Sequence, residues 1–153
     1  MPDFTIKRAD ASVYDDLAEL WERSVMATHH FVSEEDIVFF RSVVRDGFAA
    51  LDTRYLECDG HPAAFMAIGG DKVEMLFVDP AYFGLGAGSL LMRIAVEAGA
   101  RYVDVNEQNH GARAFYEHLG FETVSRDETD DSGREYPVLH MALGDGLRQA
   151  GEI

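Results

Sequence analysis

The stretch from Val73 to Ser89 reads Val-Glu-Met-Leu-Phe-Val-Asp-Pro-Ala-Tyr-Phe-Gly-Leu-Gly-Ala-Gly-Ser, and it decides the fold. An apolar strand ends near Pro80, and a loop with glycine at every second position then opens a helix. Alternating glycines let several backbone N–H groups converge on one point. The helix adds its unpaired N-terminal amides and the positive end of its dipole. This pattern predicts a phosphate pocket built from main chain, and hence a cofactor that carries phosphate.

Length and composition predict a single globular domain. The 153 residues, 17.0 kDa and 47% apolar content suit one domain over residues 1–153 and exclude intrinsic disorder. We expect residues 144–153 to form a loose tail. The lone cysteine, Cys58, cannot form an internal disulfide, which is typical of a cytoplasmic protein. No run approaches the roughly 18 apolar residues of a membrane span, and the first residues lack the features of a signal peptide, so we expect no membrane partner.

The chain is strongly acidic, with 28 acidic and 13 basic residues and a formal net charge of −15. Such a surface repels the phosphates of nucleic acids, so we expect no nucleic-acid partner. The same charge makes an anionic ligand harder to bind, because local donors must overcome a repulsive background.

Helical periodicity and alternation divide the N-terminal half. Asp10 or Ser12 is expected to cap the first helix, and Ser33 the second, which has three acidic residues in its first turn. The expected elements are a strand over residues 4–8, a helix with an apolar stripe from Val13 to Val25, a break at 27–31, a helix with a stripe from Ile37 to Phe48, and hairpin strands over 54–58 and 63–68.

The C-terminal half alternates strands and helices. The expected elements are a strand over residues 72–79, a helix from Leu90 to Ala98, a strand over 102–105, a helix from Asn109 to Leu119, and strands over 122–127 and 136–143. A strand, a helix and a strand in this order imply a right-handed parallel crossover. The prediction is an α/β fold with a mixed sheet of about seven strands and helices on both faces.

The glycine loop allows two other interpretations. Residues 84–89 loosely match the dinucleotide-binding pattern Gly-x-Gly-x-x-Gly, with Asp104 about twenty residues on, where a ribose-binding acid would lie. Against this, residues 79–83 separate the strand from the first glycine, Asp104 lies inside its strand, and only one parallel crossover is visible. A turn without a ligand is the other alternative, although three alternating glycines lose much chain entropy for a mere turn.

A second stretch, residues 105–121, reads Val-Asn-Glu-Gln-Asn-His-Gly-Ala-Arg-Ala-Phe-Tyr-Glu-His-Leu-Gly-Phe. It resembles the asparagine-to-Tyr…Gly-Phe signature of the GNAT superfamily, the acyl-coenzyme A-dependent N-acyltransferases. Residues 78–88 resemble that family's cofactor motif, and the order of elements matches, so the resemblance covers nearly the whole chain. It implies a GNAT-type fold and an N-acetyltransferase that moves an acetyl group from acetyl-CoA to an amine by direct transfer in a ternary complex.

Two positions depart from the family pattern. The family usually has Arg or Gln where this chain has Phe83, and often a basic residue where it has Leu85. The loop therefore lacks side-chain donors to the pyrophosphate, and backbone amides must carry more of the binding. Arg93 and Arg113 are the nearest compensating residues by sequence. We predict that the coenzyme still binds.

The resemblance also implies how the coenzyme lies. Two parallel strands, 72–79 and 101–106, splay apart and hold the pantetheine arm between them. Backbone groups at the end of the first strand bond the arm as a neighbouring strand would and polarise the thioester carbonyl. The cofactor-binding residues implied in this way are Leu76, Phe77, Val78, Phe83, Gly84, Leu85, Gly86, Ala87, Gly88, Ser89, Asn106, Asn109 and Tyr116.

Aminolysis of a thioester benefits from a proton donor for the leaving sulfur and a proton acceptor for the amine. By resemblance the donor is Tyr116, for which a core tyrosine is the alternative. Glu74 is the first candidate for the proton acceptor, since alternation puts it on the same strand face as Leu76 and Val78. A solvated charge at the start of the strand fits this residue equally well. His29 is the second candidate, because histidine titrates near neutral pH.

The acceptor pocket is expected near the junction of the first two helices, with His29, His30, Phe31 and Tyr136 as substrate contacts. The His-His pair also suggests a metal, but no further ligands stand at a matching spacing, so we expect none. The acceptor is an amine of a small molecule or peptide, and the net acidity favours a cationic one. Many members of the family dimerise, so a homodimer is one expected state. The alternative function is a catalytically weak acyl-CoA-binding module, which Phe83 favours and Tyr116 disfavours.

Overall fold

The computed structural model describes residues 2–144, and its elements follow the predicted order. They are β1 (Thr5–Arg8), α1 (Tyr14–Thr28), α2 (Glu34–Ala50), β2 (Asp52–Cys58), β3 (His61–Gly69), β4 (Lys72–Val78), the short 3-10 helix η1 (Pro80–Tyr82), α3 (Ala87–Glu97), β5 (Tyr102–Asn106), α4 (His110–Leu119), β6 (Phe121–Asp127) and β7 (Val138–Leu143). Of these, only η1 was not expected. Apart from Gly144, the predicted loose tail lies outside the described residues.

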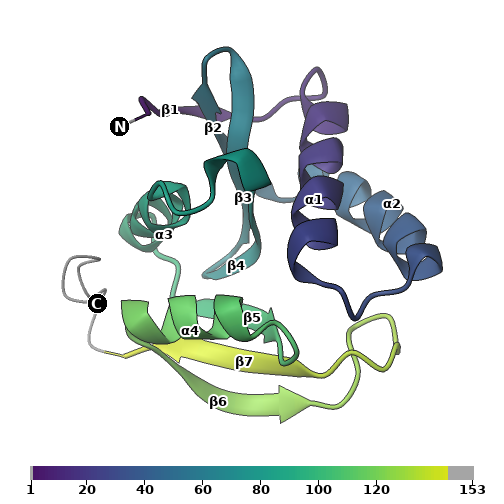
Figure 1. Cartoon of the computed structure of the whole chain (residues 1–153). Coiled ribbons are helices and arrows are strands. Elements are labelled where there is room, and N and C mark those ends of the chain that lie inside the picture. The colour runs from purple at the N-terminus through teal and green to yellow at the C-terminus, as the bar shows by residue number, and fades with distance from the viewer. Residues whose placement is uncertain (1, 145–153) are drawn as a thin grey trace.

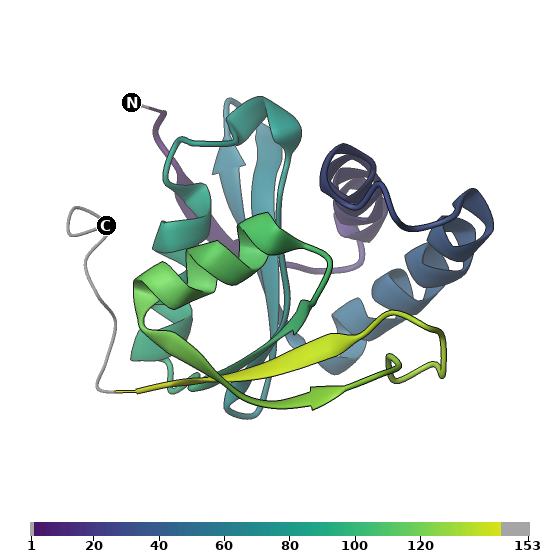
Figure 2. The same cartoon turned by 60° about the horizontal axis from the view of Figure 1, so that its bottom comes forward.

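The strands form one seven-stranded mixed sheet in the order β1-β2-β3-β4-β5-β7-β6, which confirms the predicted fold class. Strands β4 and β5 are parallel, and every other neighbouring pair is antiparallel. Helices α1 and α2 cover one face of the sheet, and α3 and α4 cover the other (Figure 1). Figure 2 shows the same two layers from a second direction, with α4 lying over the half of the sheet that contains β5 and β7.

Each helical layer has its own core. Under α1 and α2, the rings of Phe48 and Phe65 are fully buried, with centroids 5.4 Å apart. Under α3 and α4, the residues Leu91, Met92 and Phe121 are at most 2% exposed. Apolar burial stabilises by roughly 25 cal/mol per Å². The end of β4 therefore lies between two packed layers that fix its position.

The parallel pair β4–β5 is short. Lys72 pairs with Tyr102 and Val73 with Val103, and the ladder between these two strands ends there in the described residues. Strand β4 keeps its antiparallel partner β3 as far as Val78. The two parallel strands therefore splay apart, as expected, and β4 has free backbone groups along the edge that faces β5.

The predicted cap of α2 is confirmed, and that of α1 is wrong. The Ser33 Oγ accepts a hydrogen bond from the N–H of Asp36 at 3.2 Å. At α1, Val13 occupies the N-cap position and makes no side-chain cap bond. The Asp10 carboxylate instead accepts from the N–H of Ser12 at 2.9 Å, and so closes a local turn before the helix begins.

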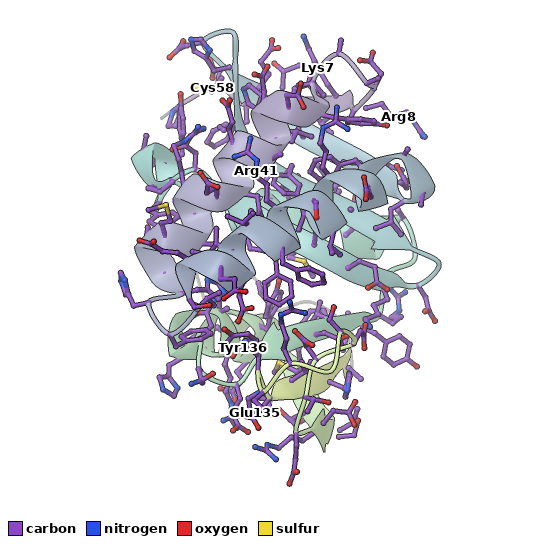
Figure 3. The ribbon with its side chains drawn as sticks, turned by 90° about the vertical axis from the view of Figure 1, so that its right-hand side faces the viewer. Lys7, Arg8, Arg41, Cys58, Glu135 and Tyr136 are labelled. Carbon is purple, nitrogen blue, oxygen red and sulfur yellow. The ribbon has the colours of Figure 1, made fainter. Side chains whose placement is uncertain are left out.

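Strand β7 begins at Val138 and not at Tyr136 as predicted. Pro137 has no N–H to give to the ladder, and the Tyr136 hydroxyl donates to the Asp36 carboxylate at the start of α2. Tyr136 therefore belongs to the β6–β7 connection. Figure 3 shows it where the helical layer of α1 and α2 meets that connection, with Glu135 farther from the helices.

Candidate active site

A cleft of about 830 Å³ opens between the end of β4, the start of α3, the C-terminal end of α1 and α4. Its volume is typical of small-ligand sites. The cleft is lined by Ser24, Thr28, His29, Leu76, Phe77, Val78, Tyr82, Phe83, Gly84, Gly86, Ala87, Gly88, Ser89, Asn109, Gly111, Ala112, Phe115 and Tyr116. This set contains every predicted cofactor-binding residue except Leu85 and Asn106.

The loop that opens α3 has free backbone donors. Gly84 and Gly86 have φ values of +75° and +87°, a left-handed conformation that glycine adopts without strain. Gly86 is the N-cap of α3, so the donors that follow lie at the positive end of the helix dipole. Within the described part of the chain, no N–H of residues 84–89 donates a hydrogen bond. The loop can therefore hold an anion with main-chain groups.

No lysine, arginine or carboxylate lines this cleft in the described residues. Neither arginine that could compensate for Phe83 is at the cleft, and the guanidinium of Arg113 instead lies 3.8 Å from the Glu117 carboxylate. Phe83 and Leu85 are 44% and 38% exposed. An anion at this loop is therefore bound without help from a cationic side chain of the cleft wall.

Leu76, Phe77 and Val78 form the wall where β4 has lost its parallel partner. Strand β3 pairs with one edge of these residues, and the other edge faces the cleft. An extended ligand with amide groups can add to such an edge as a strand does.

Tyr116 faces the same cleft from α4 and is 7% exposed. Its ring packs edge-on against those of Phe115 and Phe121, with centroids 5.1 Å and 5.8 Å away. Burial raises the pKa of Tyr116 above its usual value. The phenol therefore keeps its proton across the working pH range and gives it up only to a strong base formed beside it.

The His29 side chain, at the end of α1, contacts the start of α4. Its Nδ1 lies 2.7 Å from the Thr28 Oγ1, and its Nε2 lies 3.1 Å from the Asn109 Nδ2. Asn109 is the N-cap of α4, and its Oδ1 accepts from the N–H of Ala112 at 3.1 Å. Burial, and secondarily the neighbouring His30, lower the pKa of His29 to about 4, so its imidazole is neutral at physiological pH.

A smaller cavity of about 190 Å³ adjoins the cleft, and His29 and Phe77 line both. Helices α1 and α2 give it an apolar wall, while polar groups come from the end of β5 and the β6–β7 connection. Its remaining lining residues are Trp21, Val25, Val32, Phe40, Val44, Asn106, Asp130 and Tyr136. Asn106 therefore lies in this smaller cavity and not in the main cleft.

The predicted acceptor contacts are only partly brought together. His29 and Tyr136 line the smaller cavity. The Phe31 ring lies between theirs, with centroids 5.3 Å from His29 and 6.2 Å from Tyr136. His30 is exposed and lines neither cavity.

Glu74 does not lie on the predicted face. Glu74 has no partner residue in β3, since Ala67 pairs with Met75 and the next residue, Ile68, pairs with Val73. This β-bulge shifts the alternation by one residue, so the alternation argument for Glu74 is wrong. Its side chain is exposed and lines neither cavity.

Several lining residues were missed by sequence reasoning. Ser24 and Thr28 lie one turn apart on α1, and Phe115 lies against the α3 loop, where a Cβ on Gly88 would be 3.3 Å from its Cζ. The position of Phe115 before Tyr116 was the available signal. Nothing in the sequence marks Asp130, because its place depends on how the β6–β7 connection folds against α2.

The described residues contain no group of three or more His, Cys, Asp or Glu side chains arranged as a metal site. Among the described helices, none combines the length and hydropathy that crossing a bilayer requires.

Comparison with known proteins decides the family. Residues 27–123 match the family model described as "Acetyltransferase (GNAT) domain". The chain belongs to the GNAT acetyltransferase family. This GNAT protein is an acyltransferase of the N-acetyltransferase type, as its two motifs predict.

Its relatives include two curated N-acetyltransferases. The chain is 36% identical over 141 residues to "Peptidyl-lysine N-acetyltransferase YjaB" of Escherichia coli (strain K12), covering 90% of this chain and 95% of the relative. It is 35% identical over 139 residues to the protein of the same name from Salmonella typhimurium (strain LT2), covering 89% and 95%.

Solved structures agree on the GNAT fold. The solution structure of apo-form YjaB from Escherichia coli matches with a TM-score of 0.85 at 33% identity, over 92% of this chain and 97% of that one. The crystal structure of PaiA N-acetyltransferase from Thermoplasma acidophilum in complex with coenzyme A matches with a TM-score of 0.67 at 19% identity, over 93% and 99%.

Proposed function

We propose that this GNAT enzyme transfers an acetyl group from acetyl-CoA to the side-chain amine of a peptidyl lysine, by direct transfer in a ternary complex. One observation carries the proposal. The free amides that open α3, the unpaired edge of β4 and the Tyr116 side chain all line one cleft.

The cleft fits the parts of an acyl-CoA in turn. Backbone N–H groups of residues 84–89 would hold the pyrophosphate. The edge of β4 at Leu76 to Val78 would bond the amides of the pantetheine arm, and an N–H there would polarise the thioester carbonyl. Gly88 supports this fit, because any side chain at that position would crowd Phe115.

The amine nitrogen attacks the thioester carbonyl carbon, the carbon–sulfur bond breaks, and its electron pair leaves on sulfur. Tyr116 gives its hydroxyl proton to that sulfur. The nitrogen becomes cationic as it attacks, and the His29 Nε2 takes its excess proton. Return of the proton from the imidazolium to the phenolate restores both side chains. The products are one amide and one thiol.

The acceptor assignment rests on the smaller cavity and on the relatives. Both curated relatives carry the name peptidyl-lysine N-acetyltransferase. The apolar wall from α1 and α2 suits the methylene stem of a lysine, and the Asp130 carboxylate together with the net charge of −15 favours a cationic acceptor. We also propose a cytoplasmic location, which the single buried Cys58 supports.

An amine panel tests the function. Thiol release from acetyl-CoA is measured with a peptide containing one lysine, the same peptide with norleucine in its place, a peptide whose only amine is the α-amino group, and a polyamine. We expect the lysine peptide to be the best substrate and the norleucine peptide to be inactive. Tight coenzyme binding by calorimetry with no thiol release from any amine would reject catalysis and leave an acyl-CoA-binding module.

A further inference from the structure

His29 lies where the coenzyme cleft meets the smaller cavity, and among the described residues it shares this position only with Phe77. Under the proposed function, an amine that enters from the smaller cavity would meet the acyl group of acetyl-CoA at this junction. The protonation state and tautomer of His29 therefore bear directly on the reaction.

The α4 cap fixes one end of the imidazole. The Asn109 Oδ1 accepts from the N–H of Ala112 at 3.1 Å, so this atom is the amide oxygen and the other terminal atom is the NH₂ group. That NH₂ group lies 3.1 Å from the His29 Nε2. Since an amide nitrogen only donates, Nε2 must accept and carries no proton.

Thr28 fixes the other end independently. Its Oγ1 lies 2.8 Å from the Ser24 carbonyl oxygen and 2.7 Å from the His29 Nδ1. A hydroxyl has one proton, and the carbonyl can only accept it. The His29 Nδ1 must therefore donate to Oγ1. Both ends require the same neutral tautomer, with the proton on Nδ1 and the lone pair on Nε2.

We propose that Asn109 is a positioning residue, which through its place in the α4 cap holds His29 as the neutral Nδ1–H tautomer with the Nε2 lone pair available at the junction. This inference rests on the proposed function. In the transfer step the N–H of the acceptor amine replaces the Asn109 N–H as the donor to Nε2. Asn109 thus keeps the imidazole in the state that can accept a proton.

The surroundings of His29 agree with a neutral ring. The other titratable residues that line the two cavities with His29 are Tyr82 and Tyr116 in the cleft and Asp130 and Tyr136 in the smaller cavity, and His30 is adjacent in the chain. Among these described groups, Asp130 is the one whose negative charge could favour an imidazolium. Burial, and secondarily His30, lower the pKa of His29, and Asp130 is not among the groups that shift it.

The test is Asn109→Asp, read by ¹⁵N NMR of the histidine rings in the full-length protein without ligands. Aspartate keeps the cap, because its Oδ1 still accepts from Ala112. It also replaces the NH₂ donor with a carboxylate oxygen beside Nε2. We expect the wild type to show a protonated Nδ1, a bare Nε2 and no titration of His29 near pH 6.5. In the variant we expect a protonated Nε2 and a rise in the His29 pKa of about 1–3 units.

Asn106→Asp is the matched control. It makes the same change in the smaller cavity, which His29 also lines, and keeps its turn because Oδ1 still accepts from the N–H of Gln108. The hydrogen bond to the His29 ring comes from Asn109 and not from Asn106. We expect it to move the His29 pKa by less than half as much. If Asn109→Asp does not fold, Thr28→Val tests the other end, and we expect it to give a mixture of the two tautomers.

Activity supplies a second readout. The kcat/KM of Asn109→Asp for the lysine peptide should fall more at pH 6 than at pH 8, because an imidazolium cannot accept the amine proton. A wild-type His29 protonated on Nε2, or a titration that Asn109→Asp leaves unchanged, would overturn the inference. Absence of acetyl transfer with the expected NMR result would count against the proposed function and leave the tautomer assignment standing.

Discussion

At the scale of single residues, the proposed transfer depends most on Tyr116. It lines the cleft, and burial raises its pKa, so the phenol would keep its proton until a thiolate forms beside it. We predict that Tyr116→Phe lowers kcat by about 100-fold or more, while calorimetry shows nearly unchanged affinity for coenzyme A, since the ring and its packing remain. Tyr102→Phe, at an exposed tyrosine of β5, should leave both quantities unchanged. A Tyr116→Phe enzyme with wild-type kcat would remove the acid role.

His140 predicts a pH dependence of stability. Its Nδ1 lies 2.7 Å from the Asp104 carboxylate and its Nε2 2.7 Å from that of Asp127, and these contacts, Asp127 first, raise the pKa of His140. The stabilisation is fully present below the unfolded-state pKa of about 6.5 and is lost as pH rises through the higher folded-state pKa. We expect His140→Gln to lower Tm more at pH 6 than at pH 9.

The wild type must be compared with His140→Gln, because His29 has the opposite effect on how stability depends on pH. Its pKa is lowered in the folded state, so it costs stability as pH falls below about 6.5. The difference in Tm between the wild type and His140→Gln at each pH removes this contribution, because both proteins contain His29. His61→Gln, at an exposed histidine of β3, serves as the control. Equal losses of Tm at both pH values for His140→Gln would show that the two contacts have no net electrostatic effect.

Sequence patterns predict some of these residues and not others. Tyr116 follows from a local motif whose residues are contiguous on one helix. The contact between His29 and Asn109 joins residues 80 positions apart. No periodicity or spacing encodes it, because it depends on how α1 and α4 pack on opposite faces of the sheet.

At the scale of elements, the proposed coenzyme site depends on the loop that opens α3. Gly86 has φ +87° and open space where a Cβ would lie, so Gly86→Ala is strained by its backbone and not by crowding. We predict that Gly86→Ala lowers the free energy of unfolding by about 1–2 kcal/mol. We also expect its affinity for coenzyme A to fall, because the amides of residues 84–89 are displaced.

Gly70→Ala is the matched control for that strain. Gly70 has φ +63°, also has open space, and lies in the β3–β4 turn away from the cleft. It should lose similar stability, measured by chemical unfolding, and keep its affinity for coenzyme A. If both variants lose affinity alike, the loop amides have no special role.

The β6–β7 connection carries the prediction about the acceptor. The Asp130 Oδ1 accepts from the N–H groups of Ser132 and Arg134, both at 2.9 Å, and the residue lines the smaller cavity. Asp130→Asn keeps that oxygen and removes only the charge. We expect the KM for the lysine peptide to rise several-fold with little change in kcat, and Asp131→Asn, next along the chain, to leave KM unchanged. A KM that is the same in Asp130→Asn would exclude this carboxylate from acceptor binding.

Element order was predictable, because hydrophobic periodicity and glycine turns mark it locally. Two elements show where this fails. The bulge at Glu74 leaves no trace in the sequence of the strand, which reads as a regular alternation at its start, and it moves the residue off the expected face. Tyr136 reads as part of a strand, but a hydrogen bond to Asp36 on α2 draws it into the connection.

At the scale of the whole molecule, an anionic coenzyme must bind to a protein of net charge −15 through a cleft lined by no cationic side chain in the described residues. Close cation–phosphate pairs weaken with salt, whereas long-range repulsion between like charges is relieved by it. Here only the second effect acts at the cleft wall. We therefore predict that coenzyme A binds more tightly as NaCl rises from about 0.02 to 0.3 M, a range over which screening strengthens several-fold.

Phe83→Arg should reverse that dependence. Phe83 is 44% exposed at the mouth of the loop, so the change costs little packing and puts a guanidinium within reach of the pyrophosphate. We expect affinity at low salt to rise and then to fall as NaCl is added, measured by calorimetry. Val38→Arg changes the net charge equally at a 71% exposed position of α2 and should retain the wild-type salt dependence, because an arginine there forms no close pair with the pyrophosphate. If wild-type affinity falls with salt as in Phe83→Arg, a cation already holds the pyrophosphate, and the account of a loop that binds through its main chain alone is wrong.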